Sequence, residues 1–410
     1  MKVLHVNQSD TVGGAAIAAH RLHEELLDQD IGSKLLVDVA KSHSELVDTI
    51  PRRRYVDSIS SRLAYYTGLN YTNHLSTFKL TTHSSFQEAD VLNFHNLHGD
   101  YFNYLALSKL TRSKPAVLTL HDMWSFTGHC AYSFGCDRWK TGCGRCPDLK
   151  TYPAVSCDRT ALEWRLKQWV YNRARLTIVS PSQWLSDLVK KSLLSHYEIH
   201  TIPNGLNTQV YRPLDRSMCR SALDLPLDGK VLLFTAQSLQ DPRKGGDLLR
   251  DALKKLPASV TKDLTLLVFG EDGEALESGV NIPVVSLAYV GGDRMKSIAY
   301  SSADAFVFPT RADNLPIVIQ ESMACGTPTV SFSIGGVPEL VRPGITGLLA
   351  NSSDTDSLAE KMTEILSSDS LRDRMAQHCR EIAVKDYDIK MQAEKYISLY
   401  KSMNNIKIRS

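Results

Sequence analysis

Two carboxylates, Asp313 and Glu321, stand eight positions apart in a segment that changes from loop to helix. Asp313 lies in a polar loop, and Pro316 has the fixed φ and the missing N–H group that suit the first position of a helix. We therefore expect a helix from about Pro316 to Cys325. One carboxylate then precedes the helix and the other lies inside it.

The N-terminus of this helix should attract an anion. Its first backbone N–H groups have no partner within the helix, and the helix dipole adds a partial positive charge. An anion would therefore lie against Asn314 and Leu315. Together with two carboxylates, this arrangement suits a phosphorylated sugar.

The longer pattern around these residues is specific. Asp313-x7-Glu321 runs into Ser-Met-Ala-Cys-Gly-Thr-Pro and continues to Gly335-Gly336 and Glu339. It resembles the acidic-x7-Glu signature of family 4 retaining glycosyltransferases, the glycosyl transferases group 1 with the GT-B fold. That family usually has Glu at the first position, where this chain has the shorter Asp313.

The resemblance implies a fold and an activity. The fold is α/β, with two Rossmann-like doubly wound domains facing across a cleft. The activity is transfer of a hexosyl group, with retention of configuration, from a nucleotide diphosphate sugar to a hydroxyl of a sugar or of a glycan, which can be lipid-linked. Polysaccharide biosynthesis is the expected setting, and catalysis needs no cofactor or metal. Two other functions stay open: a nucleotide-sugar 2-epimerase of the same fold, and a non-catalytic nucleotide-sugar-binding protein.

Length and charge limit the other possibilities. The chain has 410 residues, enough for two domains of ordinary size. Lys and Arg total 47 against 45 Asp and Glu, so a nucleic-acid partner is not indicated. No apolar window has the roughly 18 to 20 residues of a spanning helix. The apolar part of the N-terminus is too short for a secretory signal, so we expect a cytoplasmic protein with at most peripheral contact at the inner membrane face.

Short apolar strands alternate with helices through the first half of the chain. We expect strands at 2–7, 34–39, 91–94, 116–120 and 176–179, and helices at 15–29, 101–110 and 183–192. Such alternation predicts a parallel sheet with ligands at the carboxyl ends of its strands.

A second series of strands follows a hinge near Asn204 to Asn207. Its expected strands are 231–236, 264–269, 305–308 and 329–332, with helices at 247–256 and 295–301. We predict an acceptor domain at 1–206 and a donor domain at 207–387. Residues 388–410 form an amphipathic helix that, by the resemblance, packs back on the first domain.

Two features follow strands of the first domain. Gly13-Gly14 lets the backbone approach a ligand, although a Gly pair also simply makes turns, and it lacks the dinucleotide-binding spacing. His121 follows the strand at 116–120, where a cleft is expected. A lone His is commonly structural, but the resemblance makes His121 the catalytic-cleft histidine and places the glycine loop near the transferred sugar. His95 and His98 occupy a similar strand end, with the two roles open.

Lys244 follows the strand at 231–236 and offers a cation to a diphosphate. The family pairs this lysine with an arginine about five residues earlier, where this chain has Leu239, and the adjacent Arg243 is the available substitute. A solvated basic turn is the alternative. By the resemblance, Asp313 orients the sugar, Glu321 accepts hydrogen bonds from the ribose, and the Asn314 and Leu315 amides hold the diphosphate.

Four of the eight cysteines, Cys130, Cys136, Cys143 and Cys146, lie in one segment with C-x5-C-x6-C-x2-C spacing. Four thiolates can close a tetrahedral structural zinc site. Because the x5 and x6 spacings are not standard, disulfides and free thiols stay open, although a cytoplasm disfavours disulfides. The segment follows His121 directly, so we expect it beside the acceptor.

A basic and aromatic insertion lies in the first domain. It begins with Arg52 to Arg54 and continues with Tyr65, Tyr66, Tyr71 and Phe78. It either grips a polyprenyl-phosphate or glycan acceptor, or the arginines are solvated and the aromatic rings pack locally.

Overall fold

The computed structural model describes residues 1–51, 54–271, 279–287 and 290–409, and the chain divides into two compact units. Unit 1 comprises Met1–Pro203 and Gln392–Ser410, and unit 2 comprises Asn204–Met391. The sequence suggested a division at residue 206. Among the described residues, no helix has the length and apolar character needed to cross a membrane.

Unit 1 is built on a seven-stranded parallel sheet with the strand order β3-β2-β1-β4-β5-β6-β7. The strands are β1 (Lys2–Ser9), β2 (Gly32–Val39), β3 (Val47–Thr49), β4 (Val91–Phe94), β5 (Ala116–Thr119), β6 (Thr177–Ser180) and β7 (Ile199–Thr201). The α-helices that belong to it are α1 (Gly14–Asp28), α2 (Arg54–Thr67), α3 (Ser84–Glu88), α4 (Leu107–Leu110), α5 (Thr160–Tyr171), α6 (Gln183–Val189) and most of α16 (Ile389–Arg409). The short 3-10 helices are η1 (Leu75–Thr82), η2 (Tyr104–Ala106), η3 (Trp124–Phe126) and η4 (Arg138–Lys140).

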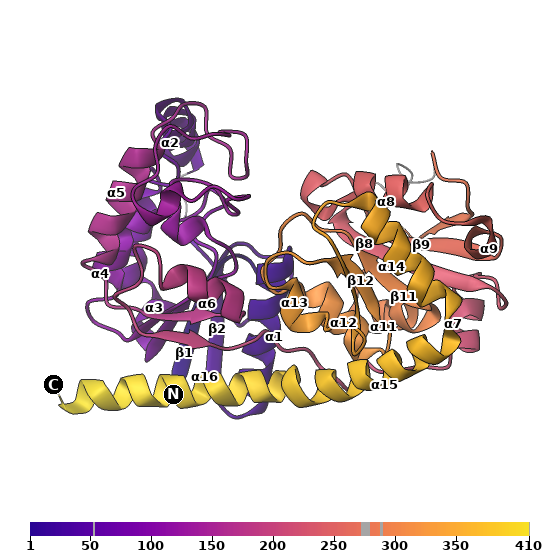
Figure 1. Ribbon diagram of the computed structural model, residues 1–410. Helices are drawn as coiled ribbons and strands as arrows, with labels where there is room; N and C mark the ends of the chain where they lie inside the picture. The colour runs from indigo at the N-terminus through magenta and orange to yellow at the C-terminus, as the bar shows by residue number, and fades with distance from the viewer. Residues whose placement is uncertain (52–53, 272–278, 288–289, 410) are drawn as a thin grey trace. The chain divides into compact units, whose positions relative to one another are not determined.

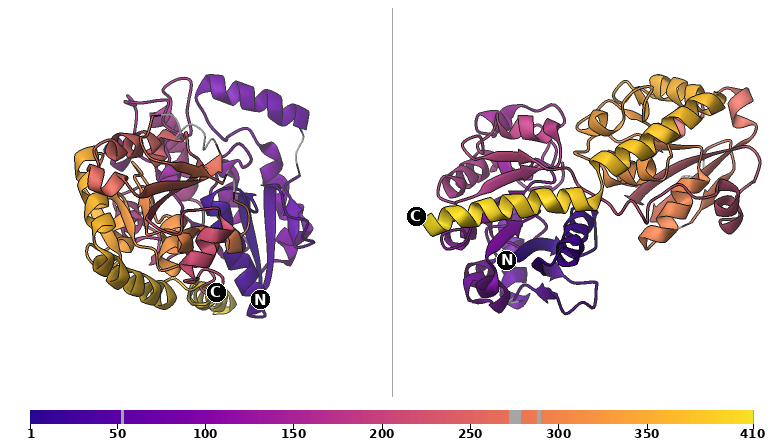
Figure 2. Two further views of the ribbon diagram at one scale, coloured as in Figure 1. Left: turned by 90° about the vertical axis from the view of Figure 1, so that its right-hand side faces the viewer. Right: turned by 90° about the horizontal axis from the view of Figure 1, so that it is seen from below.

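The two faces of this sheet differ. Side chains alternate along a strand, so Leu4 and Val6 of β1 enter the large core, whereas Val3 enters a smaller cluster with α1 and α16. Figures 1 and 2 show α16 lying beside the strands of unit 1. Tyr400 Oη of α16 accepts a hydrogen bond from Asn93 Nδ2 at 2.8 Å. The C-terminal helix therefore covers the second face.

Unit 2 contains a six-stranded parallel sheet with the order β10-β9-β8-β11-β12-β13. The strands are β8 (Lys230–Ser238), β9 (Leu264–Glu271), β10 (Val284–Ser286), β11 (Ala305–Phe308), β12 (Thr329–Phe332) and β13 (Gly347–Ala350). The described helices are α7 (Arg216–Ala222), η5 (Pro242–Lys244), α8 (Gly246–Leu253), α9 (Ala258–Thr261), α11 (Asp293–Ser302), α12 (Ile317–Ala324), α13 (Val337–Leu340), α14 (Thr355–Ser367) and α15 (Asp369–Asp386). Apolar clusters fill both faces of the sheet, under helices (Figure 1).

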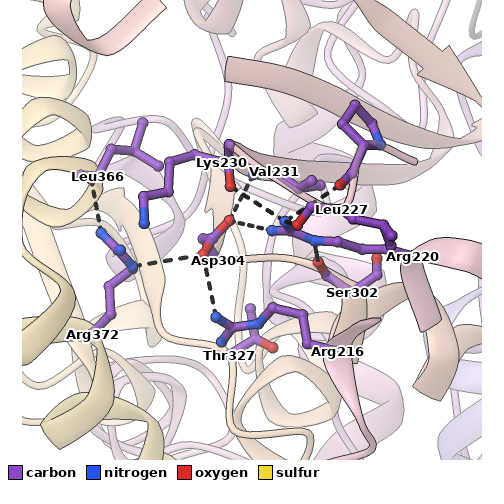
Figure 3. Close-up of polar contacts among 12 residues, drawn as sticks. Arg216, Arg220, Leu227, Lys230, Val231, Ser302, Asp304, Thr327, Leu366 and Arg372 are labelled. Atoms are coloured by element: carbon purple, nitrogen blue, oxygen red, sulfur yellow. Dashed lines mark hydrogen bonds and ion pairs between the residues drawn. The ribbon is translucent and has the colours of Figure 1, made fainter. Parts of the chain in front are cut away.

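A buried carboxylate ties the amino ends of β8 and β11 to two helices. Asp304 Oδ2 accepts from Arg220 Nη2 of α7 and from the Val231 amide of β8, both at 2.7 Å. Arg216 and Arg372 also approach Oδ1, at 3.4 and 3.8 Å (Figure 3). Asp304 is 2% exposed, and these cations make its burial tolerable. Asp304 lies just before the first residue of β11, so this cluster is at the amino end of the strand, and the loop after Phe308 is at the other end.

The prediction of two doubly wound parallel sheets is confirmed, with local differences. Helix α12 begins at Ile317, and Pro316 is its cap with ψ 117°. The helix expected at 101–110 is instead the short η2 followed by α4. Asn103 adopts an extended conformation and accepts a hydrogen bond from the Leu105 amide at 3.0 Å, so it starts the helix later than predicted.

Candidate functional site

Three predicted residues of unit 2 meet at the carboxyl ends of β8 and β11. Asp313 Oδ2 accepts from Lys244 Nζ at 2.7 Å and from Arg243 Nη1 at 3.1 Å. The adjacent side chains of Lys244 and Arg243 therefore converge on one oxygen. The Lys244 ammonium also lies 4.9 Å from the centre of the Phe308 ring, and Lys244 and Asp313 are largely buried.

Two glycines allow the loops that carry these residues to approach closely. Gly245 has φ 75° and ends the η5 turn, where a Cβ atom would collide with the Pro309 carbonyl oxygen. Gly335 has φ 57°, and a Cβ atom there would collide with the Asp313 carbonyl oxygen. The same carbonyl accepts from the Gly336 amide at 3.2 Å. Backbone contacts that tolerate no side chain thus fix the positions of both loops.

Burial and the ion pair act on the pKa values in opposite directions. Burial alone would raise the pKa of Asp313, but Lys244 and Arg243 lower it below the ordinary carboxyl value. Burial lowers the pKa of Lys244, and Asp313 opposes that change. Asp313 and Lys244 therefore stabilise each other in their charged forms.

Glu321 lies on α12 and has two tyrosine partners. Tyr211 Oη donates to Oε1 at 3.1 Å, and Tyr300 Oη donates to Oε2 at 3.2 Å. Tyr211 Oη also lies 2.8 Å from Asp293 Oδ1. Glu321 is 3% exposed, so the tyrosines hold a buried carboxylate in one orientation. No local signal in the sequence pointed to these tyrosines, because they lie 110 and 21 positions before Glu321.

The loop before α12 supplies the predicted backbone donors. The Asn314 amide donates to Asp313 Oδ1 at 3.1 Å, so this donor already has a carboxylate partner inside the loop. Leu315 is buried in the core of unit 2. The loop is therefore shaped by both polar and apolar contacts.

The glycine loop of unit 1 connects β1 to α1. Gly13 has φ 89° and is the cap of α1, a conformation that favours glycine, and Gly14 is the first helical residue. The same loop is anchored through Asp10, whose Oδ2 accepts from the Ser42 amide at 2.8 Å and from Ser42 Oγ at 2.6 Å. The chain after β1 is thus tied to the chain after β2.

His121 lies just after β5, is half-buried, and contacts a pair of buried imidazoles. Its Nε2 is 3.1 Å from His95 Nδ1, and His95 Nε2 is 3.0 Å from His5 Nδ1. His98 Nε2 donates to Asp122 Oδ2 at 2.7 Å in a separate pair. His95, which the sequence left between a structural and a functional role, is therefore in direct contact with the predicted site histidine. His5 was not singled out by the sequence, because it lies inside a strand.

The cysteine segment contains thiols and one histidine. All four of its cysteines are free, and His129 Nε2 lies 3.3 Å from Cys146 Sγ. Burial raises the pKa of the Cys130 thiol to about 12 and that of the Cys143 thiol to about 11. Within the described residues, no three His, Cys, Asp or Glu side chains gather closely enough to hold a metal ion. Zinc stays a prediction from spacing, and metal analysis of the purified protein would check it.

The aromatic insertion packs locally where its side chains are described. Tyr71 lies against Trp124 with ring centres 5.6 Å apart, and Phe78 packs against the core of unit 1. Tyr66 is exposed. Arg52 and Arg53 lie outside the described residues.

Comparison with known proteins covers both units. Residues 218–382 match the family described as Glycosyl transferases group 1, and residues 12–210 match Glycosyltransferase Family 4. WcaC of Escherichia coli (strain K12), named as a colanic acid biosynthesis glycosyl transferase, is 26% identical over 363 residues, covering 83% of this chain and 85% of that protein. A D-inositol 3-phosphate glycosyltransferase of Mycobacterium avium (strain 104) is 28% identical over 212 residues, covering 49% of this chain and 48% of that protein. The chain therefore aligns with about half the length of this second relative.

Solved structures with the same fold cover nearly the whole chain. Sucrose-phosphate synthase from Thermosynechococcus elongatus has a TM-score of 0.72 and 17% identity, with 98% of each chain covered. HepE from Anabaena, crystallised with UDP and glucose, has a TM-score of 0.69 and 18% identity, with 98% of this chain and 100% of that chain covered. At such identities the likeness shows the GT-B fold alone. The two family matches together run from residue 12 to residue 382, and the chain belongs to the family 4 glycosyltransferases of group 1.

Proposed function

We propose that the protein transfers a hexosyl group from a nucleotide diphosphate sugar to a hydroxyl of a sugar or glycan, which can be lipid-linked, with retention of the anomeric configuration. The observation that carries this proposal is the cluster of Lys244, Arg243 and Asp313 at the carboxyl ends of β8 and β11. Ligands bind at this end of the strands in open parallel sheets. A buried pair of cations there suits a diphosphate.

The energies favour Lys244 as the principal anchor for the diphosphate. A charge pair at about 4 Å contributes on the order of 4 kcal/mol at an effective dielectric of 20, against roughly 0.3 to 2 kcal/mol for a helix terminus. Lys244 and Arg243 share the carboxylate of Asp313, and Arg243 Nη2 also lies 3.5 Å from Asp241 Oδ2. We assign both cations to the departing diphosphate, with the Leu315 amide as an additional donor. The Asn314 amide joins them on leaving Asp313 Oδ1.

The two carboxylates meet the sugars of the donor. Asp313 orients the transferred hexose, and Lys244 and Arg243 keep the Asp313 carboxylate ionised. Glu321 holds the ribose hydroxyls. A carboxylate has about four lone-pair sites, and the hydroxyls of Tyr211 and Tyr300 approach one on each oxygen of Glu321. The tyrosines orient the carboxylate before the donor arrives.

The reaction needs no covalent nucleophile from the protein. The bond between the anomeric carbon and the phosphate oxygen breaks, and a bond to the acceptor oxygen forms on the same face. The acceptor proton passes to the departing phosphate oxygen. Negative charge develops on the diphosphate in this step, so Lys244 and Arg243 stabilise the transition state more than the ground state. Catalysis on this route is independent of metal ions. Unit 1 contributes His121 and the Gly13-Gly14 loop to the sugar and the acceptor.

A panel of nucleotide sugars, with UDP-hexoses included, tests the donor. A bound donor at 100 times its dissociation constant should stabilise the protein by about 2.7 kcal/mol. Donors that protect are then incubated with and without glycan acceptors. Transfer with a retained anomeric centre supports the proposal. Epimerisation of the donor without acceptor would identify a 2-epimerase, and binding without any turnover would identify a non-catalytic binding protein.

Substitution of the anchors tests the site. We expect Lys244→Ala and Glu321→Ala each to lose several hundredfold in kcat/KM, as for a preorganised charge-stabilising contact of about 2.7 to 4 kcal/mol. Lys255→Ala is the matched control, because Lys255 pairs with Asp356 at the surface of the same unit. Wild-type turnover in Lys244→Ala would remove the assignment of the donor site.

A further inference from the structure

Three histidines of unit 1 form a hydrogen-bonded row in which His5 and His95 are buried and His121 is half-buried. His5 and His95 are 0% and 1% exposed, and their Nδ1 and Nε2 atoms lie 3.0 Å apart. His95 Nδ1 lies 3.1 Å from His121 Nε2, so the row ends at the histidine that we assign to the substrate. The rings of His5 and His95 are stacked, with centres 5.3 Å apart. His5 and His95 have no place in the reaction proposed above.

The sheet itself brings the three rings into line. Strands β1, β4 and β5 are neighbours, and His5 is in register with Asn93 of β4. His95 stands two positions after Asn93, and His121 stands two positions after Thr119, so period-two alternation puts their side chains on the same face. Thr119 Oγ1 donates to Asn93 Oδ1 at 2.8 Å, which confirms that this face is polar near the strand ends.

The proton positions along the row are coupled. Burial lowers the pKa of His5 to about 3 and of His121 to about 4, and lowers the pKa of His95 well below its ordinary value. All three rings are therefore neutral near pH 7. A neutral imidazole has one N–H donor and one acceptor nitrogen. Only two arrangements satisfy both contacts: protons directed from His5 toward His121, or protons directed from His121 toward His5.

The far end of the row distinguishes the two arrangements. His5 Nε2 is buried and has no hydrogen-bond partner among the described residues. If the protons point toward His5, that nitrogen carries an N–H with no protein acceptor. If they point toward His121, the same nitrogen is a bare acceptor. Orphaned buried N–H groups are rarer than under-satisfied acceptors, and an unmade donor costs about 1 to 3 kcal/mol. The second arrangement is favoured.

The nearby carboxylate is engaged elsewhere. Asp122 Oδ2 accepts from His98 Nε2 at 2.7 Å, and Oδ1 accepts from the Trp124 amide at 2.8 Å. These contacts lower the pKa of Asp122 against the effect of burial. Both carboxylate oxygens of Asp122 therefore have donors outside the row of His5, His95 and His121, although the charge of Asp122 still acts on His121.

We propose that His5 and His95 are positioning residues that fix His121 in the tautomer with its proton on Nδ1, so that His121 acts toward a sugar hydroxyl as a hydrogen-bond donor and not as a base. His5 Nδ1–H donates to His95 Nε2, and His95 Nδ1–H donates to His121 Nε2. This leaves Nδ1–H as the donor of His121. The identity of its acceptor rests on the proposed function, whereas the tautomer does not.

Nitrogen NMR of the full chain tests the tautomer directly. The chain has 13 histidines, so protein labelled with ¹⁵N-histidine is compared with His121→Asn and His95→Asn to assign the ring signals. Protonated and bare ring nitrogens resonate far apart. We expect a protonated Nδ1 and a bare Nε2 for His121 near pH 7. A protonated Nε2 on His121 would overturn the proposal.

Kinetics of the variants separate positioning from structure. His95→Leu removes the donor to His121 Nε2, and we expect kcat to fall roughly tenfold, the equivalent of one hydrogen bond of about 1.4 kcal/mol, with the donor KM unchanged. His95→Asn can donate from its amide and should recover most of kcat. The exposed His43→Asn is the control. Equal losses in both His95 variants, in proportion to their melting temperatures, would show a structural role only.

The two proposals fail in different ways. If no nucleotide sugar supports transfer but His121 carries its proton on Nδ1, the proposed function is wrong and the row of histidines stands. If transfer is found and His121 carries its proton on Nε2, the row is wrong and the function stands.

Discussion

The strand ends of the two units carry different chemistry on the same architecture. In unit 2 the residues after β8 and β11 are charged, and Lys244, Arg243 and Asp313 form buried ion pairs. In unit 1 the corresponding ends carry neutral histidines linked to one another, His95 and His121. Two parallel sheets thus offer one edge suited to an anion and another suited to hydroxyl groups. Function lies in the residues placed on the fold and not in the fold itself.

The difference follows from what burial does to each type of group. A buried charge persists only with partners, and the Lys244–Asp313 pair supplies them. A buried histidine can lose its proton instead, and burial lowers the pKa of all three histidines in the row. Twelve of the 13 histidines precede residue 204, with His378 the exception. The two units should therefore respond differently to pH.

The largest predicted effect is a selective loss of stability of unit 1 in acid. The pKa values of His5 (about 3), His23 (about 4), His121 (about 4) and His95 are all below the ordinary 6.5. Below pH 6.5 the unfolded chain takes up protons that the buried rings do not, so stability falls as pH decreases toward about 4. Each ring contributes up to about 1.4 kcal/mol per pH unit. Between pH 7 and pH 5 we expect a loss on the order of several kcal/mol.

Tryptophan fluorescence measures this effect for unit 1 alone. All five tryptophans, Trp124, Trp139, Trp164, Trp169 and Trp184, belong to that unit. Glu163 and His20 oppose the trend, because burial raises the pKa of the Glu163 carboxyl group to about 7 and the hydrogen bond to Glu24 raises the pKa of His20, but the histidines with a lowered pKa outnumber them. In unit 2 the pKa of Asp313 is below its ordinary value, so its protonation costs stability only at much lower pH. The protection factors of β8 peptides, which correct for the pH dependence of intrinsic exchange, should be the same at pH 5 and pH 7. If the unfolding transition followed by tryptophan fluorescence did not depend on pH, the result would contradict the neutral state of His5, His95 and His121.

The second prediction concerns a buried charge in unit 2 that lies away from the candidate site. Asp304→Ala leaves Arg220 buried without its carboxylate partner, whereas Arg372 keeps its contact to Asp369. Loss of one partner of a buried pair costs about 3 to 5 kcal/mol. Hydrogen exchange of peptides from β8, β11 and α7 should become faster by the factor that corresponds to this loss of stability. The tryptophan fluorescence of unit 1, measured at the same pH, should not change and serves as the comparison.

Asp251→Ala is the matched control for this substitution. Asp251 pairs with Lys254 at 3.5 Å, and both side chains are more than half exposed. Such surface pairs contribute about 0 to 1 kcal/mol. If Asp304→Ala and Asp251→Ala behaved alike, the charged cluster of Figure 3 would not stabilise unit 2.

The sequence predicted the central strands of both sheets but not their edges. Strand β11 is a continuous apolar run, β4 is apolar apart from Asn93, and both are buried on both faces, so the short apolar run identifies them. The edge strands β3, β7 and β10 have three residues each and are partly exposed, so they carry little pattern. They become strands because a neighbour in the sheet supplies their hydrogen bonds.

The candidate site divides in the same way. Asp313 and Glu321 lie in one motif, and Lys244 follows a recognisable strand, so local sequence indicates them. Local sequence does not indicate the residues that hold these side chains in place. His5 meets His95 across 90 positions, and Tyr211 meets Glu321 across 110. These contacts depend on which strands become neighbours, which a single sequence does not specify.

The smallest predicted effect tests whether neutral donors orient the charged site of unit 2 as they do the row in unit 1. Tyr300→Phe removes only the hydroxyl that donates to Glu321 Oε2, and the ring remains buried. A hydrogen bond to a charged group contributes about 1.5 to 3 kcal/mol, so nucleotide affinity should fall roughly tenfold at the lower limit. Titration calorimetry with the protecting nucleotide measures the change. Tyr387→Phe, which loses a longer hydroxyl contact to the Glu339 carbonyl, is the control. Equal affinities for Tyr300→Phe and wild type would mean that the helix alone orients Glu321, and only unit 1 would then use neutral donors to orient its site.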